Sequence, residues 1–202
     1  MILSLPDGLV VDLHDIEDAA YSRLAELVAT YEVRPRDEVL RDIVEVLCAA
    51  ARSRYESDPR GAVAHLTTAL ELAPYLRDRS AIVARLYGLR AYVRATMGDP
   101  SAALADYDAA IETAPTHATY RNNRSVCRRQ VGDLRGALED ALAAVAENTQ
   151  SGLYWLTLAE AYAALENEAD AALAVRHALQ LNPSLGRQLD PALRRWIPET
   201  PH

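Results

Sequence analysis

A pattern of small residues that recurs every 34 positions constrains this chain more than any other feature. The recurring alanines form two aligned columns, one at Ala103, Ala137 and Ala171 and the other at Ala110, Ala144 and Ala178. Such a period, with apolar residues at helical spacing inside each unit, is typical of stacked helix–turn–helix units. One helix pair cannot bury its apolar faces alone, so the pattern predicts several consecutive pairs packed together.

A helix-breaking position and a helix-ending position recur with the same period. The break falls at Gly98, Gly132 and Glu166, and the end falls at Pro115, Thr149 and Pro183. Glycine weakens a helix and proline cannot continue one. The pattern predicts paired helices over residues 82–97 with 100–113, 117–131 with 134–147, and 151–165 with 168–181.

The stretch from Gly152 to Pro183 resembles the tetratricopeptide repeat. That family has the pattern W-x2-L-G-x2-Y followed by A-x3-F and P, and this chain has Trp155, Leu158, Ala159, Tyr162, Ala171, Val175 and Pro183 at those positions. Ala159 stands where the family often has Gly, and Val175 where it often has Phe. A divergent upstream unit with Ala62 and Pro74 extends the resemblance to residues 43–183, with seven extra residues near Leu76 to Ile82.

This resemblance implies an all-α fold, an α-α superhelix or tetratricopeptide-like solenoid of about four helix–turn–helix repeats with a capping helix at each end. We expect residues 1–35 to form an N-terminal arm and capping helix, residues 36–183 the solenoid, and residues 184–202 a C-terminal capping helix and tail. The turn signal Pro6-Asp7-Gly8 leaves two alternatives for the first 13 residues, a hairpin or an extended arm. Asp190-Pro191 is a suitable start for the last helix.

The residue types argue against catalysis, cofactors and metals. All 21 basic residues are Arg, so a Schiff-base or phosphate-loop lysine is absent. Cys48 and Cys127 are far apart and are expected to be buried thiols, and the histidines have no metal-ligand spacing. An acidic cluster from Asp12 to Asp18 lacks the spacing of a calcium loop and suits a helix start. We therefore expect no enzymatic activity, no cofactor and no metal site.

The expected location is cytoplasmic. The segment MILSLPDGLVV has no basic region and is interrupted by Pro6 and Gly8, unlike a secretory signal. No run of about 18 apolar residues occurs, so a membrane span is not expected.

In the family that the chain resembles, the first helices of the repeats line a concave groove that binds an extended or helical peptide. The corresponding positions here are Arg54, Tyr55, Arg85, Leu89, Tyr92, Asn122, Asn123, Val126, Arg129, Gln130, Thr157 and Glu160. Residues 60–131 carry ten basic and six acidic residues, whereas both flanking segments are acidic. We expect a protein-interaction module, an adaptor or scaffold, whose centrally basic groove binds a peptide or protein with an acidic or C-terminal segment. The alternative for these residues is an ordinary solvated helix face.

A carboxylate clamp of the kind found in chaperone-binding members of the family is not present. Asn123 occupies one Asn position of that clamp. Gly88 and Tyr92 stand where its first Lys and Asn would be, and Leu153 and Thr157 where its second Lys and Arg would be. Binding of a chaperone tail is therefore not expected.

The first helices 84–97 and 118–131 contain seven arginines and no acidic residue. Because a charge that faces a core must be paired, we predict ion pairs from Arg90 to Asp106 and from Arg124 to Asp140. The pattern assigns no role to Arg121 or Arg128. Two alternative functions remain: a self-associating scaffold that dimerises through Trp196, Ile197 or the N-terminal arm, and a nucleic-acid-binding solenoid that uses these arginines. A pI near 5.1 disfavours the second, and both a monomer and a homodimer stay open.

Overall fold

The computed structural model describes residues 2–5, 10–12, 18–33, 36–187, 189 and 191–196. The turn expected at Pro6-Asp7-Gly8, the acidic residues Asp15 and Glu17, the helix start at Asp190, and Ile197 lie outside these residues. The chain divides into two compact units, Met1–Ala114 and Pro115–His202, which are described separately. Within the described residues, every helix is too short or too polar to cross a membrane.

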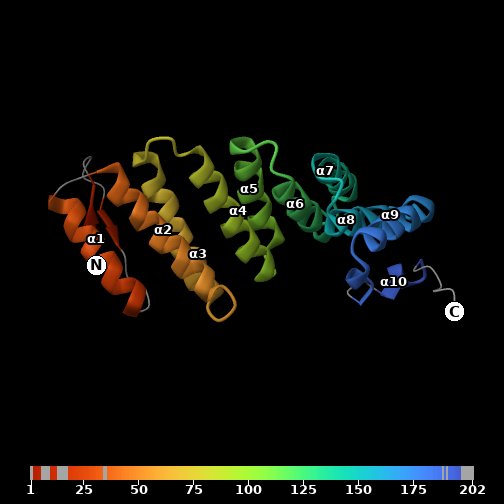
Figure 1. Ribbon diagram of the computed structural model, residues 1–202, viewed down its shortest axis with the longest axis horizontal. Coiled ribbons are helices and arrows are strands. Elements are labelled where there is room, and N and C mark those ends of the chain that lie inside the picture. Colours follow the sequence, from red (N-terminus) through yellow and green to blue (C-terminus); the bar gives the residue numbers. More distant parts are fainter. Residues whose placement is uncertain are drawn as a thin grey trace. The chain divides into compact units, whose positions relative to one another are not determined.

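The first unit begins with a β-hairpin and continues with helices (Figure 1). Strands β1 (Ile2–Ser4) and β2 (Val10–Asp12) pair antiparallel with Leu3 opposite Val11, so the hairpin alternative is the correct one. The helices are α1 (Asp18–Val33), α2 (Asp37–Arg54), α3 (Pro59–Leu72), a short 3-10 turn η1 (Ala73–Tyr75), α4 (Ser80–Thr96) and α5 (Pro100–Thr113).

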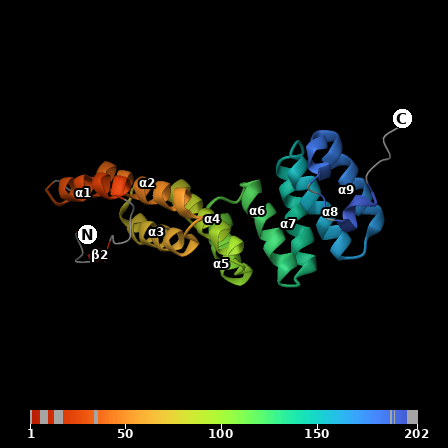
Figure 2. The ribbon, with the colours of Figure 1, turned by 90° about the horizontal axis from the view of Figure 1, so that it is seen from below.

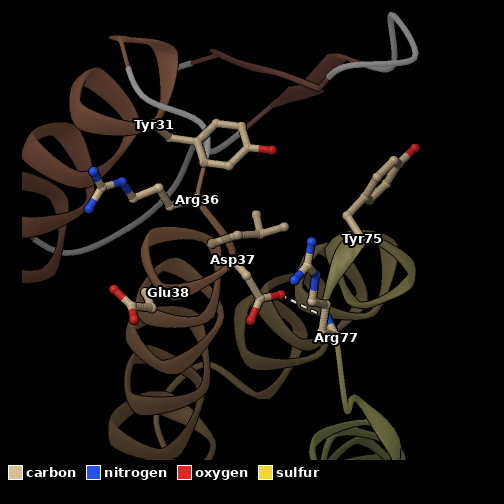
Figure 3. Close-up of a pocket in the computed structure, with 7 residues that line it drawn as sticks. Tyr31, Arg36, Asp37, Glu38, Tyr75 and Arg77 are labelled. Carbon is tan, nitrogen blue, oxygen red and sulfur yellow. Dashed lines mark hydrogen bonds between the residues drawn. The ribbon is translucent and has the colours of Figure 1, made fainter.

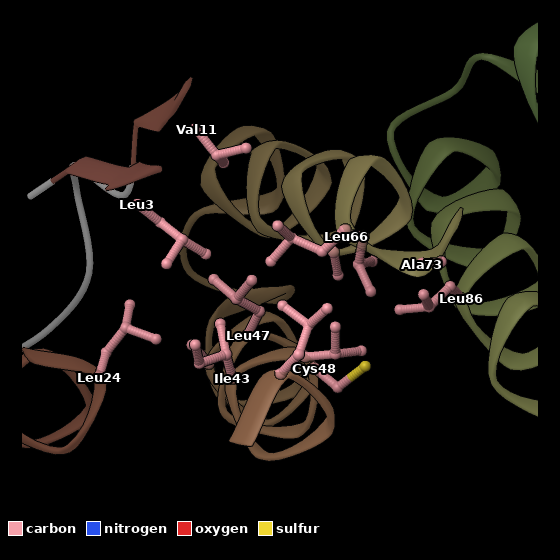
Figure 4. Close-up of a cluster of buried hydrophobic side chains, with 14 of the residues drawn as sticks. Leu3, Val11, Leu24, Ile43, Leu47, Cys48, Leu66, Ala73 and Leu86 are labelled. Carbon is pink, nitrogen blue, oxygen red and sulfur yellow. The ribbon is translucent and has the colours of Figure 1, made fainter. Parts of the chain in front are cut away.

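The hairpin closes one side of the core of this unit. Leu3 and Val11 point inward and are almost fully buried, and α1 adds Leu24 from another side (Figure 4). Ile43 from α2 and Leu66 from α3 complete the contact. Alternation along a strand explains this arrangement, because successive side chains point to opposite faces.

The second unit consists of two antiparallel helix pairs and a short C-terminal segment. Figure 2 shows α6 (Ala118–Gln130), α7 (Leu134–Glu147), α8 (Gly152–Ala164) and α9 (Glu168–Leu181) side by side in chain order. The 3-10 turn η2 (Pro183–Arg187) and the one-turn helix α10 (Pro191–Arg194) follow. Leu185, Leu189 and Leu193 from this segment pack into the core with Leu158 and Val175.

The predicted helix pairs are confirmed as α4 with α5, α6 with α7, and α8 with α9, and the fold is all-α with tetratricopeptide-like helix pairs. Both alanine columns are completely buried at the helix contacts, as the close approach of paired helices requires. In the C-terminal segment the 3-10 turn η2 comes before the last helix, and α10 begins at Pro191, next to the predicted start.

The turns within the pairs α4–α5, α6–α7 and α8–α9 repeat the same backbone geometry. Gly98 and Gly132 adopt the left-handed conformation with φ of 80° and 87°, and Glu166 does so at 58°. The second helix of each pair then starts with a side-chain cap: Asp58, Asp99, Asp133 and Asn167 each accept a hydrogen bond from the backbone N–H three residues on. The pair α8–α9 therefore makes the same turn as the two pairs before it, with Glu166 where they have glycine, a residue that fits the left-handed conformation less well.

Candidate functional site

Three of the predicted groove residues surround one apolar pocket in the first unit. Tyr55, at the end of α2, and Leu89 and Tyr92, on α4, line a cavity of about 310 Å³. The Tyr55 and Tyr92 rings meet edge to face, with centroids 5.9 Å apart and planes at 66°. The other lining residues are Ala51, Arg52, Leu66 and Val93.

The sequence did not single out these four additional residues for the site. Ala51 lies one helical turn before Tyr55, and Val93 one turn after Leu89, so i, i+4 spacing from the predicted residues is a signal that could have found them. Leu66 lies on α3, and it reaches the pocket only because α3 packs against α2 and α4.

The hydroxyl of Tyr55 has a polar partner beside the pocket. It donates a hydrogen bond to Glu56 Oε1 at 2.9 Å, and this bond to a carboxylate raises the pKa of Tyr55 above its usual value. The phenol is therefore neutral at neutral pH, and Tyr55 lines the pocket without a charge.

The two predicted arginines of the first unit make ion pairs and do not line this pocket. Arg54 Nη2 lies 2.8 Å from Asp58 Oδ2, in the turn between α2 and α3. Asp58 also caps α3. The pKa of Asp58 is lowered, chiefly by the hydrogen bond from the Gly61 N–H and also by the nearby Arg54 guanidinium. Arg85 pairs with Glu45 on α2. These contacts hold neighbouring helices together.

The predicted residues of the second unit lie on α6 and α8. Arg129 Nη2 and Glu160 Oε2 join these helices at 2.7 Å, and Asn122 Nδ2 donates to Asn123 Oδ1 at 3.2 Å. Thr157 is buried and donates to the Leu153 carbonyl. Val126 is half-buried and Gln130 is exposed. The structure thus brings Arg129 and Glu160 together and leaves Gln130 in solvent.

All seven arginines of helices α4 and α6 are paired with carboxylates. Arg85 pairs with Glu45, Arg90 and Arg94 with Asp106, Arg121 with Glu147, Arg124 and Arg128 with Asp140, and Arg129 with Glu160. All five acids lie on helices that flank α4 or α6 within their own units. Four of them lie outside residues 60–131, and the fifth, Asp106, lies within that range. The net positive charge of residues 60–131 is therefore largely neutralised by acids from other parts of the chain. A sum of charges over a sequence segment does not include these partners.

Two of these arginine clusters are buried and have the same geometry. Arg90 donates to both carboxylate oxygens of Asp106, at 2.9 and 2.7 Å, and Arg124 donates to both oxygens of Asp140, at 2.7 and 2.6 Å. The two predicted pairs are confirmed. Each carboxylate also accepts from a second arginine, from Arg94 at 2.8 Å for Asp106 and from Arg128 at 3.1 Å for Asp140. Bidentate pairing with a second donor is how a buried carboxylate is fully satisfied.

The contacts of Arg128 and Arg121 account for both residues. Arg128 belongs to the second cluster and also donates to the Gly136 carbonyl at 3.1 Å. Arg121 pairs with Glu147 at 3.0 Å and donates to the Pro115 carbonyl. Both therefore link α6 to its neighbouring segments in the second unit.

Both cysteines are buried thiols, as predicted. Desolvation raises the pKa of Cys48 and of Cys127 to about 11, so neither is a thiolate at neutral pH. Since the thiolate is the reactive form of cysteine, these residues act as small core side chains.

Comparison with known proteins supports this architecture. Residues 84–117, which hold most of α4 and all of α5, match the family model of the tetratricopeptide repeat. Tetratricopeptide repeat protein 36 of Bos taurus is 45% identical over 58 residues, which is 29% of this chain and 31% of that relative, so the match spans about a third of the relative.

Solved structures share the fold at low sequence identity. The structure of BtubC (BKLC) from P. vanneervenii has a TM-score of 0.69 at 21% identity, over 88% of this chain and 77% of that one. The structure of YrrB, described as a tetratricopeptide-repeat protein with an unusual peptide-binding site, has a TM-score of 0.63 at 17% identity, over 85% of each chain.

Proposed function

We propose that this chain binds a peptide segment of a protein partner at the pocket between α2 and α4. Its residues 84–117 match the model of the tetratricopeptide repeat, a family of protein-interaction modules. The observation that carries the proposal is this pocket of about 310 Å³, where Tyr55, Leu89 and Tyr92 meet. Tyr92 is 43% exposed although it is large and aromatic. Tyrosine is among the residues enriched at binding hot spots.

The pocket favours one bulky apolar side chain of the peptide. Its volume is at the lower end of the range for ligand sites, which suits a single anchor residue. Full burial of a Leu, Phe or Met side chain contributes about 1.5–3 kcal/mol, and edge-to-face contact with the two tyrosine rings adds about 0.5–1.5 kcal/mol. The anchor would therefore supply most of the affinity of a short peptide.

The charge preference of the site is a smaller part of the proposal. An acidic or C-terminal group of the peptide would have to replace Glu45 as the partner of Arg85, or Glu160 as the partner of Arg129. These arginines are partly exposed, so such an exchange is worth only about 0.2–1 kcal/mol. We propose that the half-buried Asn123 and the exposed Gln130 on α6 make further polar contacts to a partner, because Asn122 and Thr157 are buried.

The test is a selection of peptides from a random library with the full chain as bait. We expect the selected peptides to share a bulky apolar residue and to bind the Tyr92→Ala variant about tenfold more weakly, a loss of about 1.4 kcal/mol. Tyr21→Ala is the matched control, because Tyr21 is a tyrosine of nearly equal exposure, 42%, on α1. Peptides that bind both variants equally well would exclude the pocket.

A self-associating scaffold is the second candidate, favoured by the outer face of the hairpin. Ile2 and Val10 are both more than half exposed on that face. Trp196 packs on the core of the second unit and lies under the Arg195 guanidinium at 4.5 Å, so it is engaged within its own chain. A molar mass that rises with concentration in light scattering, and stays monomeric in an Ile2→Ser, Val10→Ser variant, would support dimerisation.

Nucleic-acid binding has less support. Phosphate recognition needs arginines that are free to displace counterions, and the seven arginines of α4 and α6 already have carboxylate partners.

A further inference from the structure

A second pocket lies at the other end of α2 from the proposed peptide site (Figure 3). Its volume is about 500 Å³, and it is lined by Tyr31, Arg36, Asp37, Glu38, Leu40, Tyr75 and Arg77. Along α2, the last residue that lines the second pocket is Leu40 and the first that lines the peptide pocket is Ala51, a rise of about 16 Å. The second pocket is therefore an independent site within the same unit.

The seven-residue insertion in the repeat pattern builds one wall of this pocket. Its loop is fixed to α2 through the backbone of Arg77: the Arg77 N–H donates to Asp37 Oδ1 at 2.7 Å, and Arg41 donates to the Arg77 carbonyl at 2.9 Å. Arg41 also pairs with Asp37 at 3.1 Å. The backbone of Arg77 is thereby held in place while its side chain stays available.

The Asp37 carboxylate repels a bound anion only weakly, because its negative charge already has hydrogen-bond donors. The Arg77 N–H and then the Arg41 guanidinium lower the pKa of Asp37, which means that its charge is already compensated by donors. Glu38, the other acid, extends on the side of α2 away from Arg77 and Tyr75 (Figure 3).

The Tyr31 hydroxyl borders the same space. Tyr31 is only 5% exposed, and its hydroxyl makes no hydrogen bond to any residue that the structure describes. Figure 3 shows this hydroxyl and the Arg77 guanidinium directed toward the space between α1 and η1. The Arg77 guanidinium forms no salt bridge among the described residues, although its charge makes a small contribution to the lowered pKa of Asp37. A guanidinium and a phenol pointing into one space form a donor pair for an oxyanion.

Apolar surface completes the pocket. Leu40 is buried, and the Tyr31 and Tyr75 rings border the cavity. This volume is larger than a bare carboxylate needs, and it accommodates a ring beside the anion.

We propose that this pocket binds a carboxylate carried on an aromatic or similarly sized apolar group. Arg77 pairs with the carboxylate, the Tyr31 hydroxyl donates a second hydrogen bond, and Leu40 and Tyr75 contact the apolar body. Arg36, exposed at the rim, adds long-range attraction. The same chemistry is offered by a free aromatic acid and by the C-terminal aromatic residue of a peptide.

The test follows backbone amide shifts of the full chain by NMR during titration with phenylacetate. We expect saturable shifts at residues 36–40 and 75–77, and none with phenylacetamide, which has the same ring without the charge. Arg77→Gln should weaken binding about tenfold, and Tyr31→Phe about threefold, since it removes only the hydroxyl. Arg60→Gln is the control for charge, because Arg60 is exposed on α3 away from the pocket.

Three results would overturn the proposal: no saturable shift with phenylacetate, equal binding of phenylacetamide, or equal binding by the Arg77→Gln and Arg60→Gln variants. Tyr31→Phe keeps the ring in the core and gives an independent reading if Arg77→Gln proves unstable by thermal melting. N-acetylglycyl-phenylalanine, with its C-terminal amide as control, separates the two sources. Tighter binding than phenylacetate assigns the site to a peptide terminus, and equal or weaker binding assigns it to a free acid.

Discussion

The buried arginine–aspartate cluster of the second unit gives a sharp prediction, because the chain contains an apolar version of the same cluster. Arg124, Arg128 and Asp140 occupy positions that hold Leu158, Tyr162 and Ala174 one repeat later. The side chains of Arg124 and Asp140 are 12% and 4% exposed, so little solvent screening reduces their interaction.

Replacing Asp140 alone should be strongly destabilising. Asp140→Ala leaves the Arg124 guanidinium buried without its bidentate partner, and breaking a buried pair from one side costs about 3–5 kcal/mol. Replacing all three residues by their counterparts (Arg124→Leu, Arg128→Tyr and Asp140→Ala) removes the charges together. Such exchanges are often neutral or stabilising by about 1–4 kcal/mol.

Urea unfolding followed by circular dichroism measures both variants against the parent chain. We expect the triple variant to be more stable than Asp140→Ala although it carries more substitutions. If Asp140→Ala lowers the free energy of unfolding by less than about 1 kcal/mol, or if the triple variant is the less stable of the two, the reasoning from buried charge is refuted.

Three further predictions concern stability. Glu166→Gly should stabilise the pair α8–α9 by about 1 kcal/mol, because Glu166 is in the left-handed conformation at φ 58° and glycine adopts it without strain. The denaturant midpoint measures this, with Glu168→Gly inside α9 as the control. If both variants lower the midpoint equally, the prediction is wrong. Ala137→Leu should destabilise by about 1–3 kcal/mol through overpacking of a fully buried site, whereas Leu at the exposed Ala146 should have little effect, and equal midpoints for the two would show a loose helix pair. The pKa of Asp58 is lower in the folded than in the unfolded chain, so the contribution of its carboxylate to the free energy of unfolding is present above pH about 3.9 and is lost as the pH falls through the folded pKa. In urea unfolding, Asp58→Asn should therefore lose less stability on acidification than the parent chain does. An equal loss of stability in both would count against the cap.

Most of the fold follows from the repeat period. The alanine columns located three helix pairs, and glycine or proline at the breaks located their ends within a few residues. The hairpin could not be chosen over an extended arm, since its pairing depends on where Leu3 and Val11 find the core formed by α1, α2 and α3. The insertion was visible in the sequence, but the pocket that it walls depends on the contact of Arg77 with Asp37, which are far apart in the chain.

The candidate site was only partly predictable. The pairing of Arg90 and Arg124 followed from the rule that a buried charge needs a partner. The same rule gives no role to Arg128, because it requires one partner for Asp140 whereas a carboxylate oxygen can accept from two donors. Arginines at i, i+4 facing one aspartate were the missing signal. The apolar pocket depends on the packing of α2, α3 and α4, which periodicity alone does not give.

The central claim is that the pocket between α2 and α4 receives the anchor residue of a peptide. Amide shift mapping of the full chain with a library-selected peptide tests it most directly. The account predicts that the largest shifts fall on Ala51, Tyr55, Leu89 and Tyr92, and that they disappear when the bulky apolar residue of the peptide is replaced by Ala. Large shifts confined to other surfaces, or shifts at these residues that survive loss of the anchor, would contradict it.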